Sequence, residues 1–133
     1  MKSARKTFAV LMLFLFTICA GCSSAGSYKT INATDAVKMM QTEKDYLIID
    51  VRTQEEYDKK HIPGAVLVPI ADLREGKFEK LPNKNQTLLI YCWTGRRAED
   101  SAKLLAENGY TKVYTFGGLV EWNGDLEGTE ISE

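Results

Sequence analysis

The chain has 133 residues, of which 44% are hydrophobic and 26% charged, a composition that predicts one globular domain and excludes disordered and fibrous proteins. Lys and Arg total 17 against 18 for Asp and Glu, so the formal net charge of −1 argues against a nucleic-acid partner. With three cysteines and one histidine, we expect neither a metal site nor a disulfide framework.

The first 21 residues have the pattern of a secretory signal. Lys2, Arg5 and Lys6 precede an apolar run over residues 8–18, which is shorter than the roughly 20 residues that a membrane-spanning helix requires. A buried core helix is the weaker interpretation, because the run is apolar on every side. Removing residues 1–21 changes the formal net charge from −1 to −4, because they carry three positive and no negative charges.

The sequence Cys-Ala-Gly-Cys over residues 19–22 resembles the lipobox of bacterial lipoproteins, with Cys19 in place of the usual leucine. The resemblance implies that Cys22 is acylated and that the protein is anchored to a membrane outside the cytoplasm, in the periplasm or on the outer face of the cell membrane. Residues 22–30 then form a tether and residues 31–130 the folded domain. A redox Cys-x-x-Cys pair is the alternative, but such pairs belong at strand-to-helix turns.

Short apolar runs rich in aliphatic, β-branched and aromatic residues predict four buried strands. They cover Tyr46–Ile49, Ala65–Val68, Thr87–Tyr91 and Lys112–Phe116. Helices are predicted between them, after Asn32, after the capping box that begins at Thr53, and over Arg97–Asn108, with a short helix and a loop within Ala71–Asn85. This alternation predicts a single α/β domain with a mostly parallel central sheet and helices on both faces.

The loop after the third predicted strand concentrates the reactive and charged residues. Ligands of open parallel sheets bind beyond the carboxyl ends of the strands, which is where Cys92 lies. Backbone N–H groups of this loop can converge on an anion at the amino end of the next helix, and two arginines add full charges. Such a setting stabilises a thiolate, so we expect Cys92 to be a nucleophile rather than a buried structural cysteine. The expected substrate-binding residues are Trp93, Thr94, Gly95, Arg96 and Arg97.

Several motifs occur in one order between Ile31 and Trp122. They are Asp50-Val51-Arg52, Glu56-Tyr57, His61-Ile62-Pro63-Gly64-Ala65, the Cys-x4-Arg loop from Cys92 to Arg97, and Gly117-Gly118 followed by Trp122. The ordered set resembles a single-domain rhodanese. The resemblance implies a rhodanese-like fold and a sulfurtransferase in which Cys92 carries sulfane sulfur as a persulfide. It also implies that the loop amides and Arg97 hold the bound anion.

The expected cycle has two displacements and needs no metal or cofactor. Cys92 takes sulfur from a small anionic or persulfide donor such as thiosulfate, which releases sulfite, and a thiol or cyanide acceptor then removes it. Trp93 and Arg96 are expected to shape the entrance, and the bulk of Trp93 to favour a thiol or larger acceptor over a small anion.

Three alternatives stay open. Four residues separate Cys92 from Arg97, whereas related dual-specificity phosphatases have five, so a phosphatase or arsenate reductase is a second chemistry for the loop. A non-catalytic binding or sulfur-carrier module is another, although binding alone would not need the thiol. An exported redox protein is the third, and it would depend on an external resolving cysteine.

The remaining motif residues are expected to support the site. Asp50 and Arg52 are predicted to tie neighbouring loops through charge-assisted hydrogen bonds. His61 is predicted to fix its own loop, with a role as a general base as the alternative, and Lys60 stands where the family has glycine. Trp122 is predicted to pack the last helix on the core and, secondarily, to form a pocket wall.

Overall fold

A five-stranded sheet forms the centre of the computed structural model, which describes residues 26–130. All neighbouring strands are parallel, in the order β1-β5-β4-β2-β3. The strands are β1 (Tyr28–Thr30), β2 (Tyr46–Asp50), β3 (Val66–Leu67), β4 (Thr87–Cys92) and β5 (Lys112–Gly118). The four predicted strands are thus confirmed, whereas the predicted signal, Cys19 and Cys22 lie outside the described residues.

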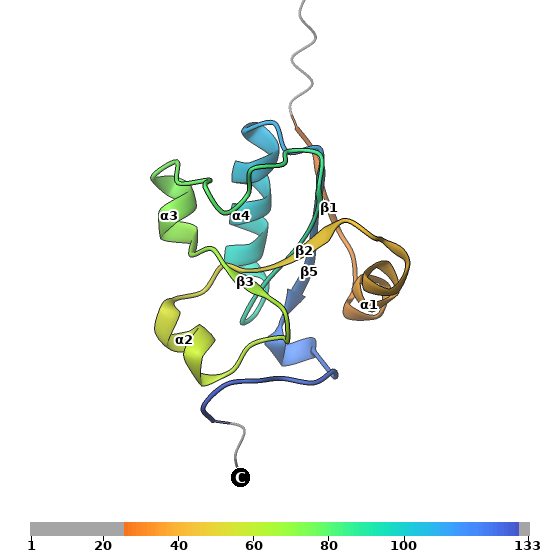
Figure 1. Cartoon of the computed structure of the whole chain (residues 1–133), viewed down its shortest axis with the longest axis vertical. Helices are drawn as coiled ribbons and strands as arrows, with labels where there is room; N and C mark the ends of the chain where they lie inside the picture. Colours follow the sequence, from red (N-terminus) through yellow and green to blue (C-terminus); the bar gives the residue numbers. More distant parts are fainter. Residues whose placement is uncertain (1–25, 131–133) are drawn as a thin grey trace, which may run out of the picture.

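Helices cover both faces of the sheet, which confirms the predicted fold class (Figure 1). α3 (Ile70–Arg74) and α4 (Arg96–Glu107) pack on one face, and α1 (Ala33–Thr42) packs on the other. α2 (Gln54–Lys59) lies at the end of the molecule where the strands finish. Among the described helices, none has the length and apolar character needed to span a membrane.

The central strand β4 is buried along its whole length. Its residues alternate between the two faces: Leu88, Ile90 and Cys92 belong to the core cluster under α4, while Leu89 and Tyr91 belong to the cluster under α1. This period of two follows from strand geometry. It directs the Cys92 side chain toward the α4 face of the sheet.

Local capping signals fix the helix starts that the sequence predicted. The Asn32 side chain accepts a hydrogen bond from the Asp35 N–H over 2.8 Å and so caps α1. Thr53 and Glu56 form the predicted reciprocal capping box at the start of α2. α4 ends just before Gly109, whose φ of +89° is a left-handed conformation that favours glycine.

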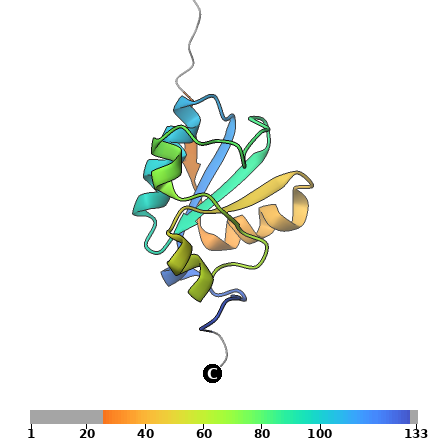
Figure 2. The same cartoon turned by 60° about the vertical axis from the view of Figure 1, so that its left-hand side comes forward.

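The predicted tether over residues 22–30 is wrong at its carboxyl end, because residues 28–30 form β1 and pair with β5. This strand has three residues at an edge of the sheet, and only Tyr28 is half-buried. Its sequence therefore shows no alternation of apolar and polar residues that would predict a strand. The predicted last helix is only a 3-10 turn, η1 (Leu119–Glu121). The chain after η1 runs beneath α2, where the Thr129 N–H donates to the Asp58 carbonyl oxygen (Figure 2).

Candidate active site

Cys92 is the last residue of β4 and lies where the strands end. Its side chain is 1% exposed and shares a core cluster with Ala98 of α4. The backbone N–H of Gly95 donates a hydrogen bond to Cys92 Sγ over 3.0 Å. No other cysteine falls within residues 26–130, and Cys92 is a free thiol. The fold therefore holds a buried thiol beside the amino end of a 12-residue helix.

Glycines shape the loop that joins Cys92 to α4. Gly95 precedes α4 with φ of +103°, a left-handed conformation that side chains other than glycine rarely adopt. A Cβ at Gly95 would lie 3.2 Å from the Cα of Gly117, and a Cβ at Gly118 would overlap the backbone of Trp93. The end of β5 thus packs directly on the loop. Sequence reasoning had Gly117 and Gly118 only as part of a family resemblance and missed this contact, which depends on the pairing of β4 with β5.

Arg97 forms a two-bond ion pair with Glu56 of α2. Arg97 Nη1 and Nη2 donate to different carboxylate oxygens of Glu56, both over 2.8 Å. The hydrogen bond from Arg97 lowers the pKa of Glu56 to about 2, although partial burial opposes this shift. In turn the hydrogen bond to Glu56 raises the pKa of Arg97, and the nearby Cys92 sulfur adds to that rise. Sequence reasoning identified Arg97 but missed its pairing with Glu56, which it placed only in the capping box and in the Glu56-Tyr57 motif.

A buried hydrogen-bond network around the Asp50–Arg52 ion pair joins the end of β2 to the end of β4. Arg52 donates to both carboxylate oxygens of Asp50, with a shortest distance of 2.7 Å, and also to the Lys60 carbonyl oxygen over 2.7 Å. Tyr91 Oη donates to Asp50 over 2.7 Å and accepts from the Ile62 N–H over 3.1 Å. Burial raises the pKa of the Tyr91 hydroxyl. For Arg52, burial favours the neutral form, but the hydrogen bond and charge of Asp50 leave its pKa raised. These bonds tie the two strand ends to the chain after α2.

His61 joins α2 to the C-terminal segment. Its Nδ1 lies 2.7 Å from the Tyr57 carbonyl oxygen and its Nε2 lies 3.0 Å from Glu127 Oε1. The ring stacks on Tyr57 with centroids 3.6 Å apart, and the backbones of His61 and Glu127 exchange two hydrogen bonds. His61 thus links the end of α2 to the C-terminal segment.

Trp93 and Val120 are the large hydrophobic side chains that are exposed among residues 26–130, at 38% and 55%. The Val120 N–H donates to the Trp93 carbonyl oxygen over 3.2 Å, so η1 lies beside the Cys92 loop. Lys60 Nζ lies 4.9 Å from the centroid of the Trp93 ring, within range of a cation–π interaction. The surface beside the Cys92 loop thus carries an exposed aromatic ring, Trp93, with the Lys60 ammonium group over it.

The five predicted substrate-binding residues lie in different surroundings. Gly95 bonds the sulfur, Arg97 pairs with Glu56, and Trp93 lies on the surface. Thr94 and Arg96 are exposed, and together with Gly95 they line a polar pocket where β1 and β5 end.

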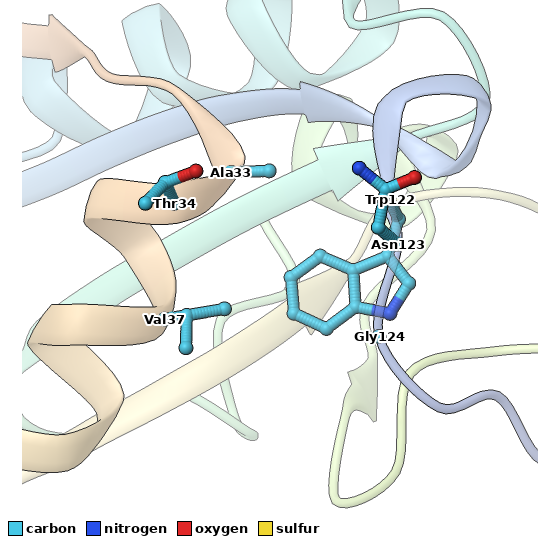
Figure 3. Close-up of a pocket in the computed structure, with 6 residues that line it drawn as sticks. All are labelled: Ala33, Thr34, Val37, Trp122, Asn123 and Gly124. Atoms are coloured by element: carbon cyan, nitrogen blue, oxygen red, sulfur yellow. The ribbon is translucent and has the colours of Figure 1, made fainter.

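Trp122 lies on the α1 side of the sheet. Its ring centroid is 5.8 Å from that of Phe116, and its Nε1 donates to the Asp125 carbonyl oxygen over 3.1 Å. The indole also lies beside Val37 of α1 and lines an apolar pocket of about 220 Å³ (Figure 3). Trp122 therefore packs on the core and forms a pocket wall on the face opposite to α4.

Comparisons with known proteins agree with this fold. A family model described as a rhodanese-like domain matches residues 32–125. Thiosulfate sulfurtransferase PspE of Escherichia coli (strain K12) is 39% identical over 71 residues, which cover 53% of this chain and 68% of that protein. The putative sulfur carrier protein YrkF of Bacillus subtilis (strain 168) is 32% identical over 78% of this chain, which spans 56% of YrkF. A solved structure described as rhodanese with anions from E. coli matches with a TM-score of 0.58 and 33% identity, covering 63% of this chain and 99% of the other.

Proposed function

Because the chain belongs to the rhodanese-like domain family, we propose that it is a sulfurtransferase that carries sulfane sulfur as a persulfide on Cys92. One observation carries this proposal, namely the hydrogen bond from the Gly95 N–H to Cys92 Sγ at the amino end of α4. Such a setting stabilises a sulfur anion, both the thiolate and the persulfide that replaces it. The relative named thiosulfate sulfurtransferase supports thiosulfate as the donor.

In the first step, the Cys92 thiolate attacks the outer sulfur of thiosulfate. The new bond joins Sγ to that sulfur, the sulfur–sulfur bond of thiosulfate breaks, and sulfite leaves with the bonding electron pair. In the second step, cyanide or a thiolate attacks the outer sulfur of the persulfide, and Cys92 leaves as a thiolate. Thiocyanate or a new persulfide is the product, and neither step needs an external oxidant or reductant.

Arg97 supplies a fixed positive charge to this cycle. Glu56 holds both terminal nitrogens of its guanidinium, so the side chain does not have to be ordered when an anion arrives. The loop N–H groups complete the anion site, because a backbone donor such as that of Gly95 is already aimed at the sulfur.

Intact mass spectrometry of the purified full chain tests the proposal. We expect the wild type to gain one sulfur atom after thiosulfate and to lose it to cyanide with formation of thiocyanate. Cys92→Ser should gain none, even though Cys19 and Cys22 remain in the chain, and Glu107→Gln, an exposed change at the far end of α4, should behave as the wild type. A folded wild type that takes up no sulfur would contradict the proposal and direct the next assay to phosphatase activity.

A sulfur-carrier role is the second candidate, and the relative named putative sulfur carrier protein favours it. Turnover separates the two roles, since a carrier takes up one sulfur per chain but does not cycle rapidly between thiosulfate and a small acceptor. Repeated cycles of thiocyanate formation per chain would support the enzyme, and a single discharge would support the carrier.

The proposal extends to location, with residues 1–21 as a lipoprotein signal and Cys22 as the acylated residue. The support is the sequence pattern of a basic start, a short apolar run and a cysteine after small residues. Growth of a bacterium expressing the full chain with an alkyne fatty acid should label the wild type and Cys19→Ala, and should not label Cys22→Ala. Labelling that persists in Cys22→Ala would contradict it.

A further inference from the structure

A polar pocket of about 400 Å³ lies beside the Cys92 loop, where β1 and β5 end. Thr94 of the Cys92 loop lines it, and five further polar side chains come from four elements: Thr30 ends β1, Thr115 lies in β5, Arg96 and Glu99 lie in the first turn of α4, and Glu121 ends η1. The proposed sulfur cycle uses none of these five side chains at the sulfur itself.

The charges in this pocket have no partners within the described part of the chain. Arg96, Glu99 and Glu121 form no ion pair there, whereas the two other arginines on this edge of the sheet, Arg52 and Arg97, are both paired. The lining thus offers one guanidinium and two carboxylates to a ligand.

The pocket also contains a buried hydroxyl without a partner. Thr115 is 1% exposed, and its Oγ1 forms no hydrogen bond with any described residue. Buried polar atoms are nearly always hydrogen-bonded, and leaving one without a partner is costly. Among the described residues, Thr115 thus combines a place in the pocket lining with a buried hydroxyl that lacks a partner.

Two glycines keep the pocket open and connect it to the reactive sulfur. A Cβ at Gly117, where φ is +85°, would lie 3.1 Å from Glu121 Oε2, so any side chain there would crowd that carboxylate. Gly117 contacts Gly95, which lines the same pocket and donates its N–H to Cys92 Sγ. One residue therefore separates the pocket from the sulfur.

We propose that this pocket binds the ammonium and carboxylate of an amino-acid-type thiol that accepts sulfur from Cys92. The two carboxylates suit an ammonium group and disfavour a simple anion such as thiosulfate, while Arg96 suits a carboxylate. A metal ion fits less well, because the described residues hold no group of three His, Cys, Asp or Glu side chains able to bind one. The assignment of this ligand as the acceptor rests on the proposed sulfurtransferase function.

The transfer step balances without a further reactant. The acceptor thiolate attacks the outer sulfur of the Cys92 persulfide, a new sulfur–sulfur bond forms on the acceptor, and the bond to Cys92 Sγ breaks with its electron pair on Sγ. The proton released by the acceptor thiol goes to solvent or to the new persulfide.

Four small thiols that carry different charged groups test the proposal. They are cysteine, cysteamine with an ammonium alone, 3-mercaptopropionate with a carboxylate alone, and uncharged 2-mercaptoethanol. We measure kcat/KM for each with the full chain, relative to 2-mercaptoethanol, so that the intrinsic reactivity of each thiol cancels between wild type and variant. Glu99→Gln and Glu121→Gln should lower the relative value about tenfold for cysteine and cysteamine, because each removes a charged partner of the ammonium.

Arg96→Gln should give the complementary result, with a loss of about tenfold for cysteine and 3-mercaptopropionate and no loss for cysteamine. Glu107→Gln, at the other end of α4, serves as the matched control. Relative values that stay the same in all three pocket variants, or that fall equally for all charged thiols, would overturn the proposal.

A binding measurement keeps the pocket testable if no sulfur transfer occurs. L-serine has the same ammonium and carboxylate as cysteine but no thiol, so it is titrated against Cys92→Ser protein and followed by NMR. We expect saturable shifts of the Thr115 and Gly117 amide signals, weakened at least tenfold by Glu121→Gln. No turnover with any thiol would contradict the proposed function alone, whereas absence of these shifts would overturn the pocket assignment.

Discussion

Glu56 and Arg97 are 41 residues apart in the sequence, yet their side chains meet through two hydrogen bonds of 2.8 Å. Thr53 adds to this arrangement, since its backbone N–H and its hydroxyl both donate to Glu56 Oε2. Glu56 thus belongs to the capping box of α2 and also fixes Arg97 at the start of α4. Because Arg97 closes the Cys92 loop, the position of α2 bears directly on the site.

Glu56→Gln is expected to lower the free energy of unfolding by about 1–2 kcal/mol at pH 7. The Glu56 and Arg97 side chains are each 35% exposed, so solvent screens their attraction. The contribution of the pair to the free energy of unfolding is therefore smaller than the pKa of about 2 for Glu56 would suggest. Urea unfolding measures the change. Glu55→Gln, which removes only an exposed contact to Lys59, is the matched control and should cost less than about 0.5 kcal/mol.

The same pair predicts a pH dependence. The folded pKa of Glu56, about 2, lies below the ordinary value of 4.5, so its stabilisation is complete above about pH 4.5 and is lost as the pH falls toward 2. The difference in stability between wild type and Glu56→Gln should therefore be constant from pH 7 to 5 and shrink below that. A difference that grows on acidification would contradict the assignment of this pKa.

Tyr91→Phe is expected to destabilise the fold by about 1–3 kcal/mol, because it leaves the buried Ile62 N–H without its partner and removes one of the hydrogen bonds to Asp50. Tyr46→Phe is the control, since the Tyr46 hydroxyl has no hydrogen bond among the described residues. Thermal or urea unfolding compares the two variants. Equal effects would show that the Tyr91 hydroxyl contributes nothing specific.

Gly95→Ala is expected to slow persulfide formation at least tenfold. The new Cβ would have to accept φ of +103° and a 3.2 Å approach to the Gly117 Cα, so the N–H aimed at Cys92 Sγ would move. Gly76→Ala has a similar φ of +75° but no atom within 4 Å of the new Cβ, so it should cost about 1–2 kcal/mol of stability and keep the rate. Mass spectrometry of sulfur uptake over time, below the melting temperature of both variants, distinguishes them.

Trp93→Ala is expected to shift acceptor preference toward cyanide by about fivefold relative to 2-mercaptoethanol. A larger acceptor loses apolar contact with the exposed ring, whereas cyanide has little contact to lose. The ratio of kcat/KM for the two acceptors measures the shift, with Trp93→Phe as the variant that retains an aromatic face. An unchanged ratio in Trp93→Ala would remove this role for the ring.

Local signals explain which elements the sequence could predict. The Asn32 cap, the Thr53 capping box and the buried run that forms β4 are all decided by residues within a few positions of one another. Cys92 could be identified for the same reason, because a strand, a glycine and two arginines surround it in the sequence.

The parts that sequence reasoning missed depend on distant pairings. β1 is defined by its hydrogen bonds to β5, and the Glu56–Arg97 pair requires α2 and α4 to meet. The His61–Glu127 contact requires the chain after η1 to return along α2. None of these contacts leaves a local pattern, because the two partners lie far apart in the sequence and nothing near either residue indicates the other.

The parallel sheet separates the start of the folded domain from the thiol. β1 runs in the same direction as β4, so the start of β1 and the end of β4, where Cys92 lies, are at opposite ends of the sheet (Figure 1). If Cys22 is acylated as we propose, the anchor joins the domain at the end of the sheet remote from the thiol.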